Sequence, residues 1–211
     1  MKSILFDLDG TLVDSSPGIK AAFRYAFKSL QLPLPDDDTL STFIGPPLET
    51  TFGKYFEDSS AISNAIQTYR DSYDSEGVHK TSLYPDIEEM LRDLSASGYD
   101  LYITTSKNEP MAIVMLTELG IIKYFKAVYG ARPNCYHKAD LIRTCLTENQ
   151  INQSYSLIIG DTSFDIIGGK TAGIKTLGVT WGFGLQHDLQ ASGADAICHS
   201  PKDIKKILKS L

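Results

Sequence analysis

The hydrophobic pattern of the chain changes character twice. Residues 4–6 form a short apolar run that predicts a buried strand, and Gly10 marks a change of direction soon afterwards. Residues 15–80 show helical periodicity instead, with no convincing strand. From Tyr84-Pro85 onward, apolar runs alternate with helical stripes. The runs predict strands at residues 99–104, 125–129, 155–159 and 175–179, and a weaker strand at residues 194–198.

Repeated strand–helix units with nearly continuous apolar strands indicate a parallel sheet covered on both faces. We therefore expect an α/β fold with a Rossmann-like core. Residues 1–14 and 81–211 would form this core, and residues 15–80 would form a helical domain inserted into it.

Several residues predict where the helices of the insert begin. Ser16 lies before Pro17, and Ser59 precedes a helical stripe, so both are expected N-caps. Asp36 is expected to cap a short helix, and residues 48–56 to form another.

Composition and charge narrow the class of protein. The net charge of −6 gives no general electrostatic reason to bind nucleic acid. The three cysteines are odd in number, widely spaced and without a zinc pattern, and they suit a reducing compartment. No apolar run is long enough to cross a membrane. We expect a cytoplasmic protein that is a monomer or a homodimer.

Polar residues follow three of the predicted strands. Asp7 and Asp9 follow the first strand, Thr104, Thr105 and Ser106 end another, and Asp161 follows a third. Ligands of parallel sheets bind beyond the carboxyl ends of the strands, so we expect these residues at one edge of the sheet.

This set of side chains suits phosphoryl transfer. A carboxylate nucleophile, Asp7, would divide one difficult displacement into two easier ones, with Asp9 as the acid and base. A cation must offset the repulsion between an attacking carboxylate and a phosphate, and Mg2+ prefers oxygen ligands. Asp7, the backbone carbonyl of Asp9, and Asp161 are the expected ligands. Asp165, one helical turn beyond Asp161, would be a further ligand or a partner of one.

Two other groups would complete the phosphate site. Lys138, at a predicted loop-to-helix junction, is the candidate to pair with Asp7 and the phosphate. The hydroxyl of Thr104 or of Thr105 would hold phosphate oxygens, and Thr104 is preferred.

At this point the chain resembles phosphatases of the haloacid dehalogenase superfamily. Residues 7–11, Asp-Leu-Asp-Gly-Thr, match the first family motif, and Thr104 to Lys107 match the second. Lys138 matches the third, and residues 160–165, Gly-Asp-Thr-Ser-Phe-Asp, match the fourth.

The resemblance implies further roles. Asp7 would attack phosphorus to form an aspartyl-phosphate, and Asp9 would protonate the leaving alcohol and then activate water. The insert resembles the family's C1-type helical cap, which closes over the site. The expected substrate contacts are Gly10, Thr11, Gly45, Pro46, Ser106, Lys54 and Arg70.

Residues 43–48 and 179–183 resemble the phosphoglycolate phosphatase branch, although Lys138 is followed by Ala139 and not by that branch's usual proline. We therefore predict a Mg2+-dependent hydrolase of a small phosphomonoester such as 2-phosphoglycolate. The alternatives are a nucleotidase, a pyrophosphatase or a β-phosphoglucomutase-like enzyme, and then a non-catalytic phosphate-binding protein.

Overall fold

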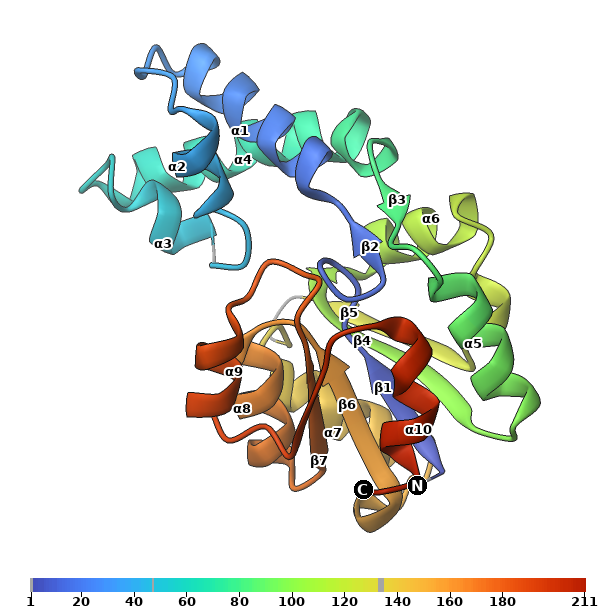
Figure 1. Cartoon of the computed structure of the whole chain (residues 1–211). Coiled ribbons are helices and arrows are strands. Elements are labelled where there is room, and N and C mark those ends of the chain that lie inside the picture. Colours follow the sequence, from blue (N-terminus) through green and yellow to red (C-terminus); the bar gives the residue numbers. More distant parts are fainter. Residues whose placement is uncertain (1, 47, 133–134) are drawn as a thin grey trace. The chain divides into compact units, whose positions relative to one another are not determined.

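The computed structural model describes residues 2–46, 48–132 and 135–211. Its main element is a six-stranded sheet with the order β5-β4-β1-β6-β7-β8, in which every neighbouring pair is parallel (Figure 1). The strands are β1 (Ser3–Phe6), β4 (Asp100–Asn108), β5 (Ala127–Ala131), β6 (Ser156–Gly160), β7 (Lys175–Val179) and β8 (Ala196–Cys198). The expected α/β fold with a parallel sheet is confirmed.

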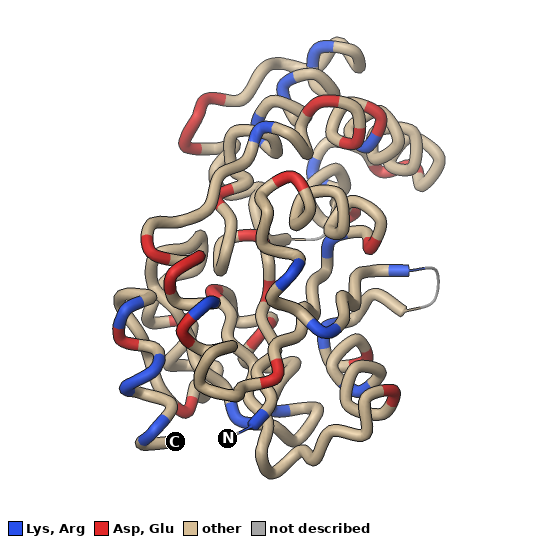
Figure 2. The backbone as a smooth tube through the Cα atoms, turned by 90° about the vertical axis from the view of Figure 1, so that its right-hand side faces the viewer, with Lys and Arg blue, Asp and Glu red and all other residues tan. Residues whose placement is uncertain are grey.

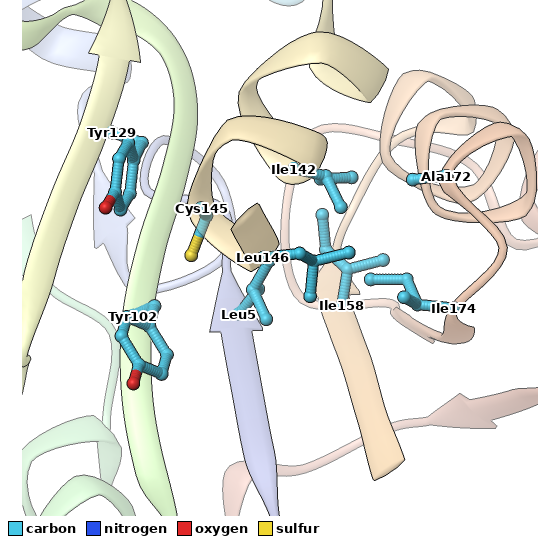
Figure 3. Packing of buried hydrophobic residues seen from close by; sticks show 9 residues of the cluster. All are labelled: Leu5, Tyr102, Tyr129, Ile142, Cys145, Leu146, Ile158, Ala172 and Ile174. Carbon is cyan, nitrogen blue, oxygen red and sulfur yellow. The ribbon is translucent and has the colours of Figure 1, made fainter. Parts of the chain in front are cut away.

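Helices cover the sheet because its strands are apolar on both sides. The helices between and after the strands of this sheet are α5 (Ile87–Ala96), α6 (Glu109–Glu118), α7 (Lys138–Glu148), α8 (Ser163–Ala172), α9 (Gln186–Ala191) and α10 (Ile204–Leu208). Short 3-10 turns are η2 (Ile122–Tyr124), η3 (Gln153–Tyr155) and η4 (Pro201–Asp203). Figure 3 shows α7 and α8 packing their apolar side chains on the strands.

The core between α7 and the sheet is tightly filled. Leu5, Tyr102 and Ile158 project from three neighbouring strands toward Ile142 and Cys145 of α7 (Figure 3). Cys145 is fully buried, and this burial raises the pKa of its thiol to about 12. Cys145 is therefore a part of the hydrophobic core.

The contacts divide the chain into two compact units, Met1–Asp14 with Ser82–Leu211, and Ser15–Thr81. Two short strands of the first unit, β2 (Val13–Asp14) and β3 (Ser82–Leu83), pair antiparallel, with Asp14 opposite Ser82. This two-stranded ribbon brings together the points where the chain leaves the first unit and returns to it.

The second unit is helical. It consists of α1 (Ser16–Ser29), α2 (Asp37–Ser41), α3 (Leu48–Phe52), α4 (Ser59–Ser75) and η1 (Gly77–His79). Its core is aromatic, with ring contacts among Phe23, Phe27, Phe43, Phe52, Tyr55, Tyr69 and Tyr73. An ion pair of 2.7 Å between Lys20 and Asp37 joins α1 to α2.

Some expected boundaries are wrong by a few residues. The N-caps of α1 and α4 are Ser15 and Asp58, not Ser16 and Ser59. The Asp58 carboxylate accepts a hydrogen bond of 2.9 Å from Ala61 N, which is the bond that an N-cap supplies. Asp36 caps α2 as expected, accepting from Thr39 N at 2.8 Å.

Other elements are shorter, longer or unexpected. Helix α3 ends at Phe52, not at residue 56, and β4 continues to Asn108, four residues beyond its expected end. The sequence pattern did not indicate β2, β3 or α9, because each is too short for its period to stand out.

Basic and acidic residues are interspersed along the chain (Figure 2). Many of them form ion pairs, such as Lys126 Nζ with Asp100 at 2.9 Å and Lys170 Nζ with Asp195 at 2.7 Å. In the described part of the chain, no helix combines the length and the apolar character needed to span a membrane.

Candidate active site

Three adjacent strands bring candidate residues to the same level of the sheet. Strand β1 lies between β4 and β6, and its last residue, Phe6, is paired with Ile103 on one side and Ile159 on the other. Asp7 and Asp161 therefore follow the ends of β1 and β6 at the level of Thr104, which lies within the longer β4. The structure brings these three candidate residues together.

Lys138 joins the groups at this edge. It is the first residue of α7, and its side chain is only 6 % exposed. Its Nζ lies 2.8 Å from Asp7 Oδ1 and 2.8 Å from Asp165 Oδ1, and donates a 3.0 Å hydrogen bond to the Thr104 carbonyl. The expected pairing of Lys138 with Asp7 is present, and the ammonium also binds Asp165.

Asp161 is fully buried and held by two hydrogen bonds. Its Oδ1 accepts from Thr11 Oγ1 at 3.0 Å, and its Oδ2 accepts from Phe183 N at 2.8 Å. Trp181 Nε1 donates in turn to the Thr11 carbonyl at 2.9 Å. The segment after β7 thus fixes the carboxylate at the end of β6 and the turn after β1.

The close approach of the segment after β7 to Asp161 requires glycine at position 182. A Cβ on Gly182 would lie 2.2 Å from the Gly10 carbonyl oxygen and 2.4 Å from Asp161 Oδ2. Gly10 itself has φ +83°, and a Cβ there would lie 2.2 Å from Asp161 Oδ2. Both glycines permit the two turns to approach the same carboxylate.

Asp165 has two structural tasks. Its Oδ2 accepts a hydrogen bond from Thr162 N at 3.0 Å, which belongs to the capping box of α8. The same oxygen also accepts from Thr162 Oγ1 at 2.8 Å. Its Oδ1 faces Lys138. Asp165 thus connects the start of α8 with Lys138, and its expected place beside a metal ion stays a prediction.

The carboxylates of Asp7, Asp161 and Asp165 form a group that suits a metal ion. One oxygen of each lies within 4.8 Å of the others, and all three residues are buried. Three carboxylates and the single ammonium of Lys138 leave two formal negative charges. A divalent cation with a preference for oxygen would balance them, and Mg2+ has this preference.

The pKa values express the same lack of positive charge. The pKa of Asp7 is raised. Burial raises it most, Lys138 partly offsets this effect, and Asp165 raises it further. Burial and then Asp165 and Asp7 raise the pKa of Asp161. Burial alone lowers the pKa of Lys138, but Asp165 and Asp7 more than offset this, so it is raised. Asp165 and Asp7 therefore favour the charged form of Lys138, and the burial of several carboxylates together favours a further cation.

Asp9 lies apart from the three-carboxylate group. Its Oδ2 pairs with Lys107 Nζ at 3.1 Å, and its Oδ1 is buried without a hydrogen-bond partner among the described residues. The expected metal contact of Asp9 is through its backbone carbonyl, and the role of its side chain in proton transfer stays a prediction. Lys107 was part of a recognised motif, but its spacing gave no role for it.

The hydroxyls at the end of β4 differ in their contacts. Thr104 and Thr105 are both buried. Thr104 Oγ1 has no partner in the described part of the chain, whereas Thr105 Oγ1 accepts from Lys107 N at 3.2 Å. Ser106 is exposed. Either threonine hydroxyl retains a proton to donate to a phosphate.

Gly10 and Thr11 form hydrogen bonds within the turn that follows β1. Gly10 N donates to the Val13 carbonyl at 2.8 Å, and Thr11 N to the Leu8 carbonyl at 3.3 Å. Since Thr11 Oγ1 donates to Asp161, the donors of both residues are engaged within the protein. Their contact with substrate stays a prediction.

The expected contacts in the helical unit also stay predictions. Lys54 and Arg70 are exposed, and Lys54 Nζ lies 5.9 Å from the centre of the Phe43 ring. Gly45 is exposed with φ +105°, and Pro46 is half-buried.

The sequence reasoning missed the Trp181–Phe183 segment as part of the site, and it gave Lys107 no role. The segment was noted only as a family resemblance. A signal was present in its two glycines, Gly182 and Gly184, directly after a buried strand, since such residues permit close backbone approach.

Comparison with known proteins places this geometry in a family. Residues 4–179 match the model of the haloacid dehalogenase-like hydrolases. A 5'-nucleotidase of Pseudomonas aeruginosa is 33% identical over 99% of this chain and 96% of its own length. The tyrosine-protein kinase PtkA of Mycobacterium tuberculosis is 33% identical over 93% of this chain and 68% of its own length.

A solved structure supports the assignment. A haloacid dehalogenase-like hydrolase from Streptococcus pneumoniae is 44% identical, with a TM-score of 0.94 over 98% of each chain. The resemblance of the four motifs and the parallel-sheet fold agree with these matches. The chain therefore belongs to the haloacid dehalogenase-like hydrolase family.

Proposed function

We propose that this protein is a Mg2+-dependent phosphomonoester hydrolase that forms an aspartyl-phosphate on Asp7. The observation that carries the proposal is the ion pair of 2.8 Å between Asp7 and Lys138, within a group of three buried carboxylates. A buried lysine alone would also suit a structural acidic cluster, but such a cluster would not need an unpartnered hydroxyl on Thr104 and a separate carboxylate, Asp9, beside it.

The chain's own residues would act in two steps. Asp7 attacks phosphorus, and the bond to the leaving oxygen breaks as Asp9 gives that oxygen a proton. Asp9 then takes a proton from water, which attacks the phosphorus bound to Asp7 and releases phosphate. Lys138 stays charged throughout and offsets the negative charge of Asp7 and of the phosphate.

Asp7, Asp161 and the backbone carbonyl of Asp9 would hold Mg2+, with Asp165 beside them. When bound, the ion supplies positive charge to a phosphate whose oxygens become more negative in the transition state. Thr11 and Phe183 would hold Asp161 in its orientation.

Thr104 or Thr105 would donate its hydroxyl to the phosphate. Thr104→Val and Thr105→Val remove one hydroxyl each and conserve the volume of the side chain. The variant with the larger rise in KM identifies the residue that contacts the phosphate.

We propose that the helical unit Ser15–Thr81 is a cap that selects the leaving group. Its separate aromatic core and its connection through β2 and β3 support this role. Lys54, Arg70, Gly45 and Pro46 are the residues on it that we expect to contact substrate.

The substrate would be a small phosphorylated metabolite. The sequence resemblance favours 2-phosphoglycolate, and a phosphoglycolate phosphatase of Vibrio parahaemolyticus is 27% identical to this chain. The higher identity of the 5'-nucleotidase favours a nucleoside monophosphate as the second candidate. A relative named as a putative pyrophosphatase is 31% identical, which makes pyrophosphate a third candidate substrate.

A panel of phosphate esters tests the proposal. Release of phosphate from 2-phosphoglycolate, a nucleoside 5'-monophosphate, pyrophosphate and a hexose phosphate is measured with Mg2+ and with EDTA. We expect turnover of at least one ester, a ranking by kcat/KM that identifies the class, and loss of activity in EDTA. Asp7→Asn should abolish turnover, whereas Asp188→Asn, at an exposed position on α9, should not.

Three outcomes would contradict parts of the proposal. Hydrolysis of an aryl phosphate by a folded Asp7→Asn variant would exclude Asp7 as nucleophile. Undiminished turnover after complete metal removal would exclude the metal. No turnover of any ester would favour a phosphate-binding protein without catalytic activity.

A further inference from the structure

Lys107 occupies an unusual place in strand β4. Between Thr104, which pairs with Tyr129, and Asn108, which pairs with Ala131, the register of β4 against β5 shifts. Four positions of β4 therefore span two of β5, and Lys107 lies in this irregular stretch. Bulges of this kind redirect a side chain and are frequent beside active sites.

The side chain of Lys107 is only 7 % exposed. An ammonium loses much hydration at such a place, so it needs an ionic or hydrogen-bonding partner. The bulged backbone is fixed by Lys107 N, which donates to Thr105 Oγ1 at 3.2 Å. From there Nζ reaches Asp9 Oδ2 at 3.1 Å.

The two oxygens of Asp9 are consequently in different situations. Oδ2 faces the ammonium of Lys107, while Oδ1 is buried and has no hydrogen-bond partner in the part of the chain that the structure describes. A charged donor at one oxygen restricts the rotation of the carboxylate, so it also restricts the direction of the other oxygen.

We propose that Lys107 is a positioning residue that holds Asp9 by Oδ2, so that Asp9 gives and takes protons through Oδ1. This inference rests on the proposed function, because it assigns the geometry of the same acid and base. Lys107 touches neither phosphorus nor the leaving oxygen in this scheme, and its effect on the reaction passes through Asp9.

The proton balance of the two steps involves one oxygen. In the first step the P–O bond to the alcohol breaks, its electron pair goes to the leaving oxygen, and the proton on Asp9 Oδ1 moves to that oxygen. In the second step Oδ1 takes a proton from water as the water oxygen bonds to phosphorus, and the electron pair of the broken P–O bond returns to Asp7. Asp9 ends protonated at Oδ1, as it began.

A positioning role predicts a dependence on the leaving group. An alkoxide leaves poorly without a proton, so hydrolysis of an alkyl phosphate requires a well-placed acid. A 4-nitrophenolate is a weaker base than an alkoxide, so it leaves without receiving a proton. Lys107→Met should therefore lower kcat/KM about 10- to 100-fold for the alkyl ester identified in the panel. This is less than the roughly 10²- to 10⁴-fold that general acid catalysis contributes, because the acid is misplaced and not removed. For 4-nitrophenyl phosphate we expect a change of less than about threefold.

Three variants make the test specific. Asp9→Asn should show the same preference for the aryl ester, and adding Lys107→Met to it should cause little further loss, because the lysine would have no acid to position. Lys126→Met is the matched control. It removes an ion pair of 2.9 Å with Asp100 at the start of the same strand, and it should leave both rates unchanged.

The outcomes separate the inference from the proposed function. If wild-type protein hydrolyses both esters and Lys107→Met loses activity toward both by one factor, Lys107 supports the fold only and the inference is wrong. Equal rates for wild type and Lys107→Met, or full additivity with Asp9→Asn, would also overturn it. A wild-type chain that hydrolyses neither ester would overturn the proposed function and this inference together.

Discussion

At the scale of single residues, Lys138 has the most demanding environment. Its side chain is buried between Asp7 and Asp165, and it also binds the backbone of β4 through the Thr104 carbonyl. One lysine therefore ties helix α7 to the ends of β1 and β4 and to the start of α8. Stability and chemistry depend on the same ammonium.

Lys138→Met should consequently destabilise the protein as well as inactivate it. The change leaves two buried carboxylates without their cation, which costs about 3 to 5 kcal/mol for a broken buried pair. Urea unfolding without metal would measure the difference. Lys138→Met combined with Asp7→Asn should recover part of the loss, since one of the unpaired charges is removed. A double variant no more stable than Lys138→Met would show that the destabilisation is not electrostatic.

At the scale of elements, short connections between strands carry much of the polar structure. The connection from β7 to β8 contains Asp195, whose Oδ2 accepts from Thr176 N and from Thr176 Oγ1, both at 2.9 Å. Lys170 of α8 binds its Oδ1 at 2.7 Å. This carboxylate links β7, α8 and the segment that leads to β8.

The stability contributed by Asp195 should depend on pH. Partial burial raises the pKa of Asp195, but hydrogen bonds from Lys170 and Thr176 more than offset it, so the folded-state pKa is lowered. A group with a lowered pKa stabilises the fold above its unfolded pKa, about 3.9, and loses this effect as the pH falls through the folded value.

We therefore expect Asp195→Asn to lower Tm at pH 7, with a difference from wild type that shrinks below about pH 3.9. Thermal unfolding across a pH series measures it. A difference that stays constant from pH 7 to pH 3 would mean that packing, and not the charge of Asp195, accounts for the effect.

At the scale of the whole molecule, the chain consists of two compact units joined by the ribbon of β2 and β3. Each unit has its own buried residues, aromatic in Ser15–Thr81 and mainly aliphatic around the parallel sheet. Asp14 and Ser82 are paired across the ribbon, so the ends of the insert meet at a position where a tight hairpin would fit.

The sheet unit should fold without the helical unit. Replacing Ser15–Thr81 by Asn-Gly would join Asp14 to Ser82 through a two-residue turn that suits antiparallel strands. We expect cooperative thermal unfolding and retained hydrolysis of 4-nitrophenyl phosphate, with a reduced ratio of kcat/KM between preferred and poor metabolite esters. A shortened chain that is unfolded would show that the sheet unit depends on the insert. One that keeps its full discrimination would contradict the proposed role of the cap.

The sequence by itself determined the class of fold and the residues at the sheet edge. Apolar runs such as residues 4–6 and 175–179 have a strong period and length, so their strands were predictable, and the parallel arrangement followed from the helices between them. Because such strands end at one edge, Asp7, Thr104 and Asp161 could be grouped before any contact was known.

Only the tertiary structure decided how these residues pair. That Lys138 binds Asp165 as well as Asp7, that Lys107 binds Asp9, and that Trp181 and Phe183 bind the first turn and Asp161 are contacts between distant segments. Local periodicity contains no information on such contacts, since they depend on strand order, on the bulge in β4 and on the close approach of two turns through glycine.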